Sequence, residues 1–209
     1  MKKVKKLLCL LALAAAIAPA SKVNAQAVSK GSIIIDPYYG FPNFGKSIAD
    51  DIQGTGLTVK GLGPCGLRFE YMVADKLGLG VDFIYNSYSV SYDDTVSTYN
   101  SSTNQYESNT YNYKLGMQRI RPQVRLNYHF VRTDAVDSYI GFGAGGNIRT
   151  WSAESTEPNF EDTSDQGTLL PVSMRIALGT RFYFTDNIGL NLELGLGGPV
   201  LSTGLSVKF

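Results

Sequence analysis

The charged residues of this sequence that could do chemistry lie at every second position of otherwise apolar segments. The clearest case is QRIRPQVRLNYHF at 118–130, where Arg119, Arg121 and Arg125 alternate with residues such as Ile120 and Val124. Alternate residues of a β-strand share one face, so these segments carry one charged and one apolar face. Eleven charged residues lie on such charged faces: Asp36, Arg68, Glu70, Asp82, Arg119, Arg121, Arg125, Arg175, Arg181, Glu193 and Lys208.

Ion pairing is the first chemistry that this set suggests. Seven of its members are basic and four are acidic, and a buried charge without a partner is costly. If the charged faces meet, they predict a polar network that fills the space between them. If the surplus positive charge stays hydrated, they predict instead a narrow passage that prefers anions.

Catalytic and metal-binding chemistry has weaker support. His129 is the only histidine, so a Ser-His-Asp arrangement would depend on this residue alone, and its position in the alternation makes it one more polar member of the charged face. The acidic residues near 152–168, such as Glu154 and Asp162, match no spacing for a cation-binding loop and are expected to be solvated. We expect no catalytic residue, no metal ligand, no cofactor and no enzyme activity.

Eight alternating segments position the charged residues. They span 29–39, 58–74, 77–92, 111–130, 139–151, 169–184, 188–196 and 200–209. Short polar turns at 74–76, 131–138 and 185–187 alternate with long polar connections at 40–57, 93–110 and 152–168, although 197–199 is short. Turns at one end and loops at the other are typical of an up-and-down membrane barrel. The tyrosine-rich connection at 93–110 is either a loop or an extension of its strands above the bilayer.

The apolar faces indicate which side of the strands meets lipid. The outer positions of 77–85, 172–184 and 188–196 carry no charge, as a bilayer demands, because Arg or Lys at the midplane costs about 2–4 kcal/mol. Aromatic residues gather near the turn end (Tyr71, Tyr128, Phe130, Phe182, Phe184, Phe209) and near the loop end (Tyr38, Tyr39, Tyr85, Tyr88, Tyr92, Trp151). The sequence therefore predicts an all-β fold, an eight-stranded antiparallel transmembrane β-barrel with up-and-down topology and its charges in the lumen.

The N-terminal residues have the pattern of a secretory signal peptide. Four lysines among the first six residues precede the apolar run Leu7–Ala18, and small residues favour cleavage between Ala25 and Gln26. We expect 1–25 to be the signal peptide and 26–209 to be the barrel domain. The signal peptide holds five of the 19 basic residues and none of the 18 acidic ones, which leaves 14 basic residues and a net charge of −4. An exported, net acidic chain is not expected to bind nucleic acid.

The hairpin GLRFEYMVADKLGLGVDFIYNSYSV at 66–90 and the terminal GLSVKF at 204–209 carry a family resemblance. The chain resembles the small outer-membrane β-barrel proteins of Gram-negative envelopes, of the OmpX and OmpA-transmembrane-domain type. The resemblance implies a cell outer-membrane location, contact with outer-membrane lipid and lipopolysaccharide, and an assembly signal at Leu205, Val207 and Phe209 for the barrel-assembly machinery.

Architecture of this kind defines no activity by itself. We expect a structural or surface-interaction role, in adhesion or envelope integrity, with a lumen plugged by the charge network. An extracellular ligand would bind through 40–57, 93–110 and 152–168. The alternative is a small anion-preferring channel or porin, and a lipid-modifying barrel enzyme ranks third.

Overall fold

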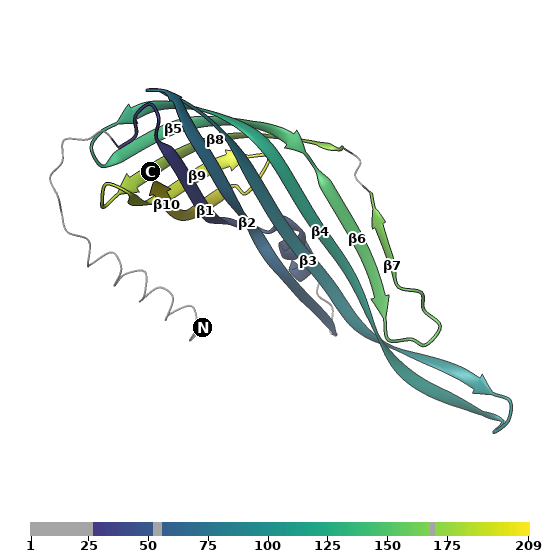
Figure 1. Ribbon diagram of the computed structural model, residues 1–209. Coiled ribbons are helices and arrows are strands. Elements are labelled where there is room, and N and C mark those ends of the chain that lie inside the picture. The colour runs from purple at the N-terminus through teal and green to yellow at the C-terminus, as the bar shows by residue number, and fades with distance from the viewer. Residues whose placement is uncertain (1–26, 52–55, 168–169) are drawn as a thin grey trace.

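Residues 27–51, 56–167 and 170–209 are described by the computed structural model, and their strands form one curved sheet (Figure 1). The elements in chain order are β1 (Ile33–Phe41), α2 (Phe44–Asp51), β2 (Leu57–Ala74), β3 (Leu77–Asn100), β4 (Gln105–Arg132), β5 (Val136–Gly146), β6 (Ile148–Ser155), β7 (Thr163–Gln166), β8 (Val172–Tyr183), β9 (Ile188–Leu196) and β10 (Leu201–Lys208). The predicted signal peptide at 1–25 and the cleavage site between Ala25 and Gln26 lie outside the described residues.

Eight of these strands close into a ring. The hydrogen-bonded order is β1, β2, β3, β4, β5, β8, β9 and β10, with every neighbouring pair antiparallel. The first and last strands complete the ring, since β1 pairs with β10 from Ile34 opposite Lys208 to Phe41 opposite Leu201. The predicted eight-stranded antiparallel barrel with up-and-down connections is confirmed, and at the level of the fold so is the resemblance to small outer-membrane barrels.

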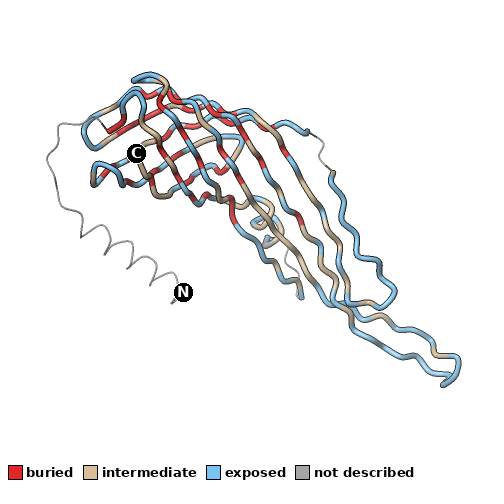
Figure 2. The backbone as a smooth tube through the Cα atoms, viewed as in Figure 1, coloured by how far each residue is buried: buried red, intermediate tan, exposed pale blue. Residues whose placement is uncertain are grey.

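Burial alternates along the barrel strands, as Figure 2 shows by colour. In β8 the residues at 172, 174, 176, 178 and 182 are exposed, while those between them are buried or half-buried. The exposed positions of β8 and β9 are apolar, from Val172 to Leu196, and the buried ones include Arg175, Arg181 and Glu193. This arrangement is the inverse of a soluble barrel and presents an apolar outer wall of the kind that a bilayer requires.

The strands differ in length, and the difference defines a rim above the barrel. A tilted strand needs about 9–11 residues to cross the apolar layer, which β9 satisfies with 9 residues. In contrast, β3 has 24 residues and β4 has 28. Their hairpin therefore projects far beyond the other strands (Figure 1). We call the projecting part of β3 and β4, together with β6 and β7, the rim.

The interpretation of 93–110 as a loop is wrong, and the alternative of extended strands holds. The β3–β4 pairing continues without interruption to Asn100 opposite Gln105. Hydroxyl groups hydrogen-bond across this hairpin, with Thr95 Oγ1 3.0 Å from Thr110 Oγ1 and Ser97 Oγ 2.8 Å from Ser108 Oγ. Such cross-strand pairs stabilise a two-stranded ribbon without a hydrophobic core. Threonine and tyrosine, which are enriched in strands, recur through this segment and were the sequence signal for it.

The other long connections also contain secondary structure. The 40–57 connection includes α2, which packs against β2 and β3 near the loop end of the barrel. The predicted strand at 139–151 is two strands, β5 and β6, interrupted at Asn147, and it begins earlier than expected, at Val136. Both pair with β4, so the interruption does not end the ladder along that strand. Among the described residues no helix is long and apolar enough to cross a membrane.

The turn end of the barrel is closed by an apolar cluster. Ala27 and Val28, at the start of the described chain, pack with Ile34, Met72 and Tyr183. The Ala27 amide donates to the Thr133 carbonyl at 2.7 Å, and Lys208 Nζ donates to the Ala27 carbonyl at 2.7 Å. The segment before β1 thus fills the opening of the barrel at this end.

Aromatic residues surround the outer wall at the turn end as expected. Tyr71, Tyr128, Phe130, Phe182, Phe184 and Phe209 are all exposed. Tyr38, placed with the loop-end aromatics, is instead buried in the lumen. Its position in the alternation with Ile34 and Asp36 explains the difference, since all three lie on the inner face of β1.

The apolar wall yields a test of the bilayer orientation. Leu192 lies at the middle of β9 and faces outward, whereas Leu196 lies at its loop end on the same face. We expect Leu192→Arg to lower the free energy of unfolding by about 2–4 kcal/mol and Leu196→Arg by roughly 0–1 kcal/mol, because the cost of an arginine depends on depth. Equilibrium unfolding by urea in phospholipid vesicles measures both, and equal costs at the two depths would contradict the orientation.

Candidate functional site in the barrel lumen

Alternate residues of β4 run down the inside of the barrel and define three levels. From the loop end to the turn end, the sequence places Arg119 and Arg121 at the outer level, Arg125 at the central level and His129 at the inner level. The charged residues of the other strands meet β4 at these levels.

Glu193 on β9 is the centre of the central level. Arg175 donates to Glu193 Oε1 from Nε at 3.1 Å and from Nη2 at 2.7 Å. Arg125 donates from Nη1 to Oε1 at 3.3 Å and from Nη2 to Oε2, and Arg68 Nη2 lies 3.2 Å from Oε1. The Tyr139 hydroxyl donates to Oε2 at 3.0 Å. One carboxylate therefore links three arginines from three strands.

Asp82 on β3 is the second acceptor of the central level. Its Oδ2 lies 3.4 Å from Arg68 Nε and 3.3 Å from Arg125 Nη1. Tyr38 donates its hydroxyl to Asp82 Oδ1 at 2.7 Å, and its ring lies 4.1 Å from the guanidinium carbon of Arg68. Arginine favours such sites because its planar fork pairs with carboxylates and stacks on aromatic rings at once.

Arg181 on β8 links three carboxylates at the inner level. It donates to Asp36 Oδ2 from Nη2 at 2.9 Å, to Asp137 Oδ2 from Nη1 at 2.9 Å and to Glu70 Oε2 from Nη2 at 2.5 Å. His129 bridges two of the same carboxylates, with Nδ1 2.7 Å from Asp137 Oδ1 and Nε2 2.9 Å from Glu70 Oε1. Only the imidazolium form can donate from both nitrogens, so these contacts hold His129 as a cation.

The central and inner levels are balanced in charge. Five cations (Arg68, Arg125, Arg175, Arg181 and His129) face five carboxylates (Asp36, Glu70, Asp82, Asp137 and Glu193), and each of these residues is at most 4% exposed. Buried charges persist when they are paired and their hydrogen-bonding groups are satisfied. We call these ten residues the lumen network.

Two of the predicted lumen residues lie outside the lumen network at the outer level. Arg119 is half-buried and its Nε donates to Asn147 Oδ1 at 2.7 Å, while Arg121 Nη1 donates to the Gly197 carbonyl at 2.8 Å. Within the described parts of the chain, neither forms an ion pair with a carboxylate. The third outlier, Lys208, lies at the turn end and contacts Ala27 and the Tyr183 ring instead.

Sequence reasoning missed Asp137, because 131–138 was assigned to a turn. Asp137 is fully buried and accepts from both Arg181 and His129. The signal for it was present, since Asp137 is in alternation with Tyr139 and Gly141 on the inner face of β5. Arg149 was also missed, although it lies within the predicted strand 139–151, and it is opposite Arg119 in the β4–β6 pairing.

A pocket of about 240 Å³ opens at the outer level, and we call it the mouth pocket. Three arginines line it, Arg119, Arg121 and Arg149, together with Trp151 and the segment Pro42–Gly45 at the start of α2. Asn43 holds that segment over the barrel, because its Nδ2 donates to the carbonyls of Leu62 at 2.8 Å and Ser87 at 2.9 Å.

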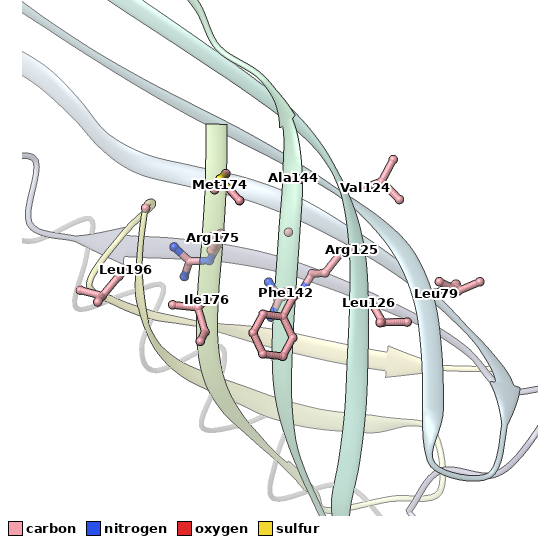
Figure 3. A pocket seen from close by; sticks show the side chains of 12 residues that line it. Leu79, Val124, Arg125, Leu126, Phe142, Ala144, Met174, Arg175, Ile176 and Leu196 are labelled. Atoms are coloured by element: carbon pink, nitrogen blue, oxygen red, sulfur yellow. The ribbon is translucent and has the colours of Figure 1, made fainter. Parts of the chain in front are cut away.

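A larger hollow, about 520 Å³, is of another kind and lies on the outer wall (Figure 3). Apolar side chains of β4, β5 and β8 surround it, including Val124, Phe142 and Met174, and Ala144 leaves room between them. Arg125 and Arg175 contribute to its lining, although their guanidinium groups belong to the lumen network. This groove belongs to the apolar face that a bilayer would cover.

The rim is tied together by a contact between β4 and the 156–162 connection. Tyr113 donates its hydroxyl to Glu157 Oε2 at 2.7 Å, and its ring stacks on Tyr92 at 5.5 Å. The hydrogen bond to the Glu157 carboxylate raises the pKa of Tyr113 to about 12. At neutral pH the tyrosine therefore remains a donor, and the rim strands stay connected above the barrel.

No cluster of three or more metal-ligating side chains occurs among the described residues.

No protein-family model and no curated protein matches this chain. Among solved structures, the chain is similar to the N-terminal β-barrel domain of Pseudomonas aeruginosa OprF, with 14% identity, a TM-score of 0.47, and 87% of this chain and 100% of that one covered. It is also similar to P. aeruginosa OprG, with 15% identity, a TM-score of 0.47, and 87% of this chain and 97% of that one covered. A third similar structure is Ail, the attachment invasion locus protein of Yersinia pestis, with 14% identity, a TM-score of 0.41, and 86% of this chain and 99% of that one covered.

The lumen network predicts that two carboxylates contribute very differently to the free energy of unfolding. Glu193→Ala would leave three arginines facing one another in a buried site, so we expect a loss of about 3–5 kcal/mol in the free energy of unfolding. Glu154→Ala breaks only the exposed pair with Lys114 and should cost less than about 1 kcal/mol. Fluorescence of the single tryptophan, Trp151, reports unfolding in vesicles, and similar losses for the two variants would contradict the network's role.

Proposed function

We propose that this chain is an integral outer-membrane protein whose barrel is a closed anchor and whose rim is the interacting surface. The observation that carries this proposal is the filled lumen. The lumen network occupies the central and inner levels with side chains at most 4% exposed, and the apolar cluster of Ala27 and Val28 covers the turn end. An eight-stranded barrel has an interior that side chains can fill completely.

The rim supports the second half of the proposal. The β3–β4 hairpin exceeds the length needed to cross a bilayer and ends in an exposed pair of tyrosines, Tyr99 and Tyr106. Tyrosine supplies contact area at low cost in conformational entropy. A surface-interaction role in adhesion or envelope integrity fits such a projection better than catalysis does, since His129 is bound by two carboxylates deep at the inner level.

Membrane partners follow from the same proposal. The apolar outer wall would contact outer-membrane lipid, and the projecting rim would lie among lipopolysaccharide chains. The terminal residues Leu205, Val207 and Phe209 would be recognised by the barrel-assembly machinery during insertion, after cleavage of a signal peptide at Ala25.

Conductance across a planar bilayer tests the closed lumen. We expect purified protein to insert without stable current steps, because the paired charges and the apolar cluster leave no hydrated path. A water-filled porin inserted into the same membrane serves as the positive control. Stable steps that favour anions would overturn the closed lumen and support a small channel instead.

Shortening the hairpin tests the role of the rim. Removal of 96–109, with Thr95 and Thr110 joined through an Asn-Gly turn, keeps the barrel register because these two residues are already opposite one another. We expect cells that produce the shortened protein to lose attachment to protein-coated glass and to one another. The folded protein in the outer-membrane fraction should stay constant, and unchanged attachment would contradict the proposal.

A further inference from the structure

Most of the positive surplus of the lumen is concentrated at the loop end. The ten residues of the lumen network balance one another, whereas Arg119 and Arg121 lie above them without an acidic partner among the described residues. The nearest acidic groups below them are already engaged. Asp82 accepts from Tyr38 and pairs with two arginines, and Glu193 pairs with three.

Arg121 is built into the barrel rather than free at its surface. Arg121 is only 6% exposed, and its Nη1 donates a hydrogen bond to the Gly197 carbonyl. Its Nε is buried and has no hydrogen-bond partner. A buried donor without a partner is uncommon and calls for an explanation. Arg121 also lines the mouth pocket, so this donor belongs to a side chain that faces a hollow large enough for a ligand.

The three arginines approach the mouth pocket from neighbouring strands. Arg119 and Arg121 are two residues apart on β4, and Arg149 faces Arg119 from β6. Positive charges placed close together repel one another, and the low-dielectric walls around a cleft concentrate their electric field. A multivalent anion between them would relieve the repulsion.

We propose that the mouth pocket binds a phosphate-type oxyanion. Guanidinium groups match the oxygens of phosphate with paired, charge-assisted hydrogen bonds. A volume of about 240 Å³ far exceeds the roughly 10–15 Å³ that a single water needs, so the pocket admits a phosphate group with part of its hydration or of the molecule that carries it. The segment Pro42–Gly45 covers the anion from the loop side.

Two sources would present the same chemistry: free phosphate from the medium, or the phosphomonoester of a lipid headgroup. Trp151 lines the mouth pocket, its ring lies 5.8 Å from the Arg149 guanidinium carbon, and it is the single tryptophan of the sequence. Its fluorescence is therefore a local reporter for either source.

The experiment titrates the purified, folded full chain in an uncharged maltoside detergent with inorganic phosphate at constant ionic strength. We expect a saturable change in Trp151 fluorescence that chloride does not produce. Arg121→Gln should weaken phosphate binding by roughly 10-fold or more, as loss of a hydrogen bond to a charged group implies. Lys60→Gln removes an exposed charge outside the pocket and should leave binding unchanged.

Vesicles with and without phosphatidic acid form the second arm. A response to phosphatidic acid alone supports the pocket with a lipid headgroup as its source, and a response to free phosphate supports the free ion. No saturable response to either, an equal response to chloride, or unchanged binding by Arg121→Gln overturns the proposal. Heat-modifiable migration on a gel verifies that each variant has folded, and Arg119→Gln provides a second variant should Arg121→Gln fail to fold.

Discussion

A charge enclosed in a narrow barrel must meet an opposite charge, and most of the lumen is arranged around that requirement. Five cations and five carboxylates fill the central and inner levels, and Glu193 and Arg181 are the two that each pair with three residues of opposite charge. Small residues make room for the long ones. A side chain at Gly78 would collide with Glu70, and one at Gly141 would collide with Arg125, so glycines beside charged side chains are part of the network's geometry.

The same requirement divides the lumen into two regions of different character. Below Arg121 every charge of the lumen network is buried and paired, which favours a rigid, closed barrel. At the outer level Arg119 and Arg121 face the mouth pocket, and neither forms an ion pair with a carboxylate of the described residues. A closed barrel and an anion-binding mouth are therefore compatible, because the balanced charges close the lumen and the surplus charges lie above the closure.

The rim adds a surface that the barrel itself does not need. The register of β3 and β4 is fixed where one face contacts the lumen and the other the apolar wall, and the ladder then continues into water on polar cross-strand pairs such as Thr95 with Thr110. The contact of Tyr113 with Glu157 joins this hairpin to the β6–β7 part of the rim. The result is a projection held in a defined direction by the barrel below it.

The sequence by itself determined the barrel, since period-two alternation with charges on one face can bury those charges only if the strands close around them. It also determined which face each residue of a strand occupies, including those that were assigned otherwise: Asp137 lay in an assumed turn and Tyr38 in an assumed aromatic belt, yet both are in alternation with lumen residues. Only the tertiary structure decided which charges meet. Arg181 and Asp36 are 145 residues apart, and alternation specifies a face but neither the depth nor the partner across the barrel, which depend on strand register and on the closure of the ring. For the same reason, the sequence revealed a surplus of positive charge, and the structure located most of it at the mouth.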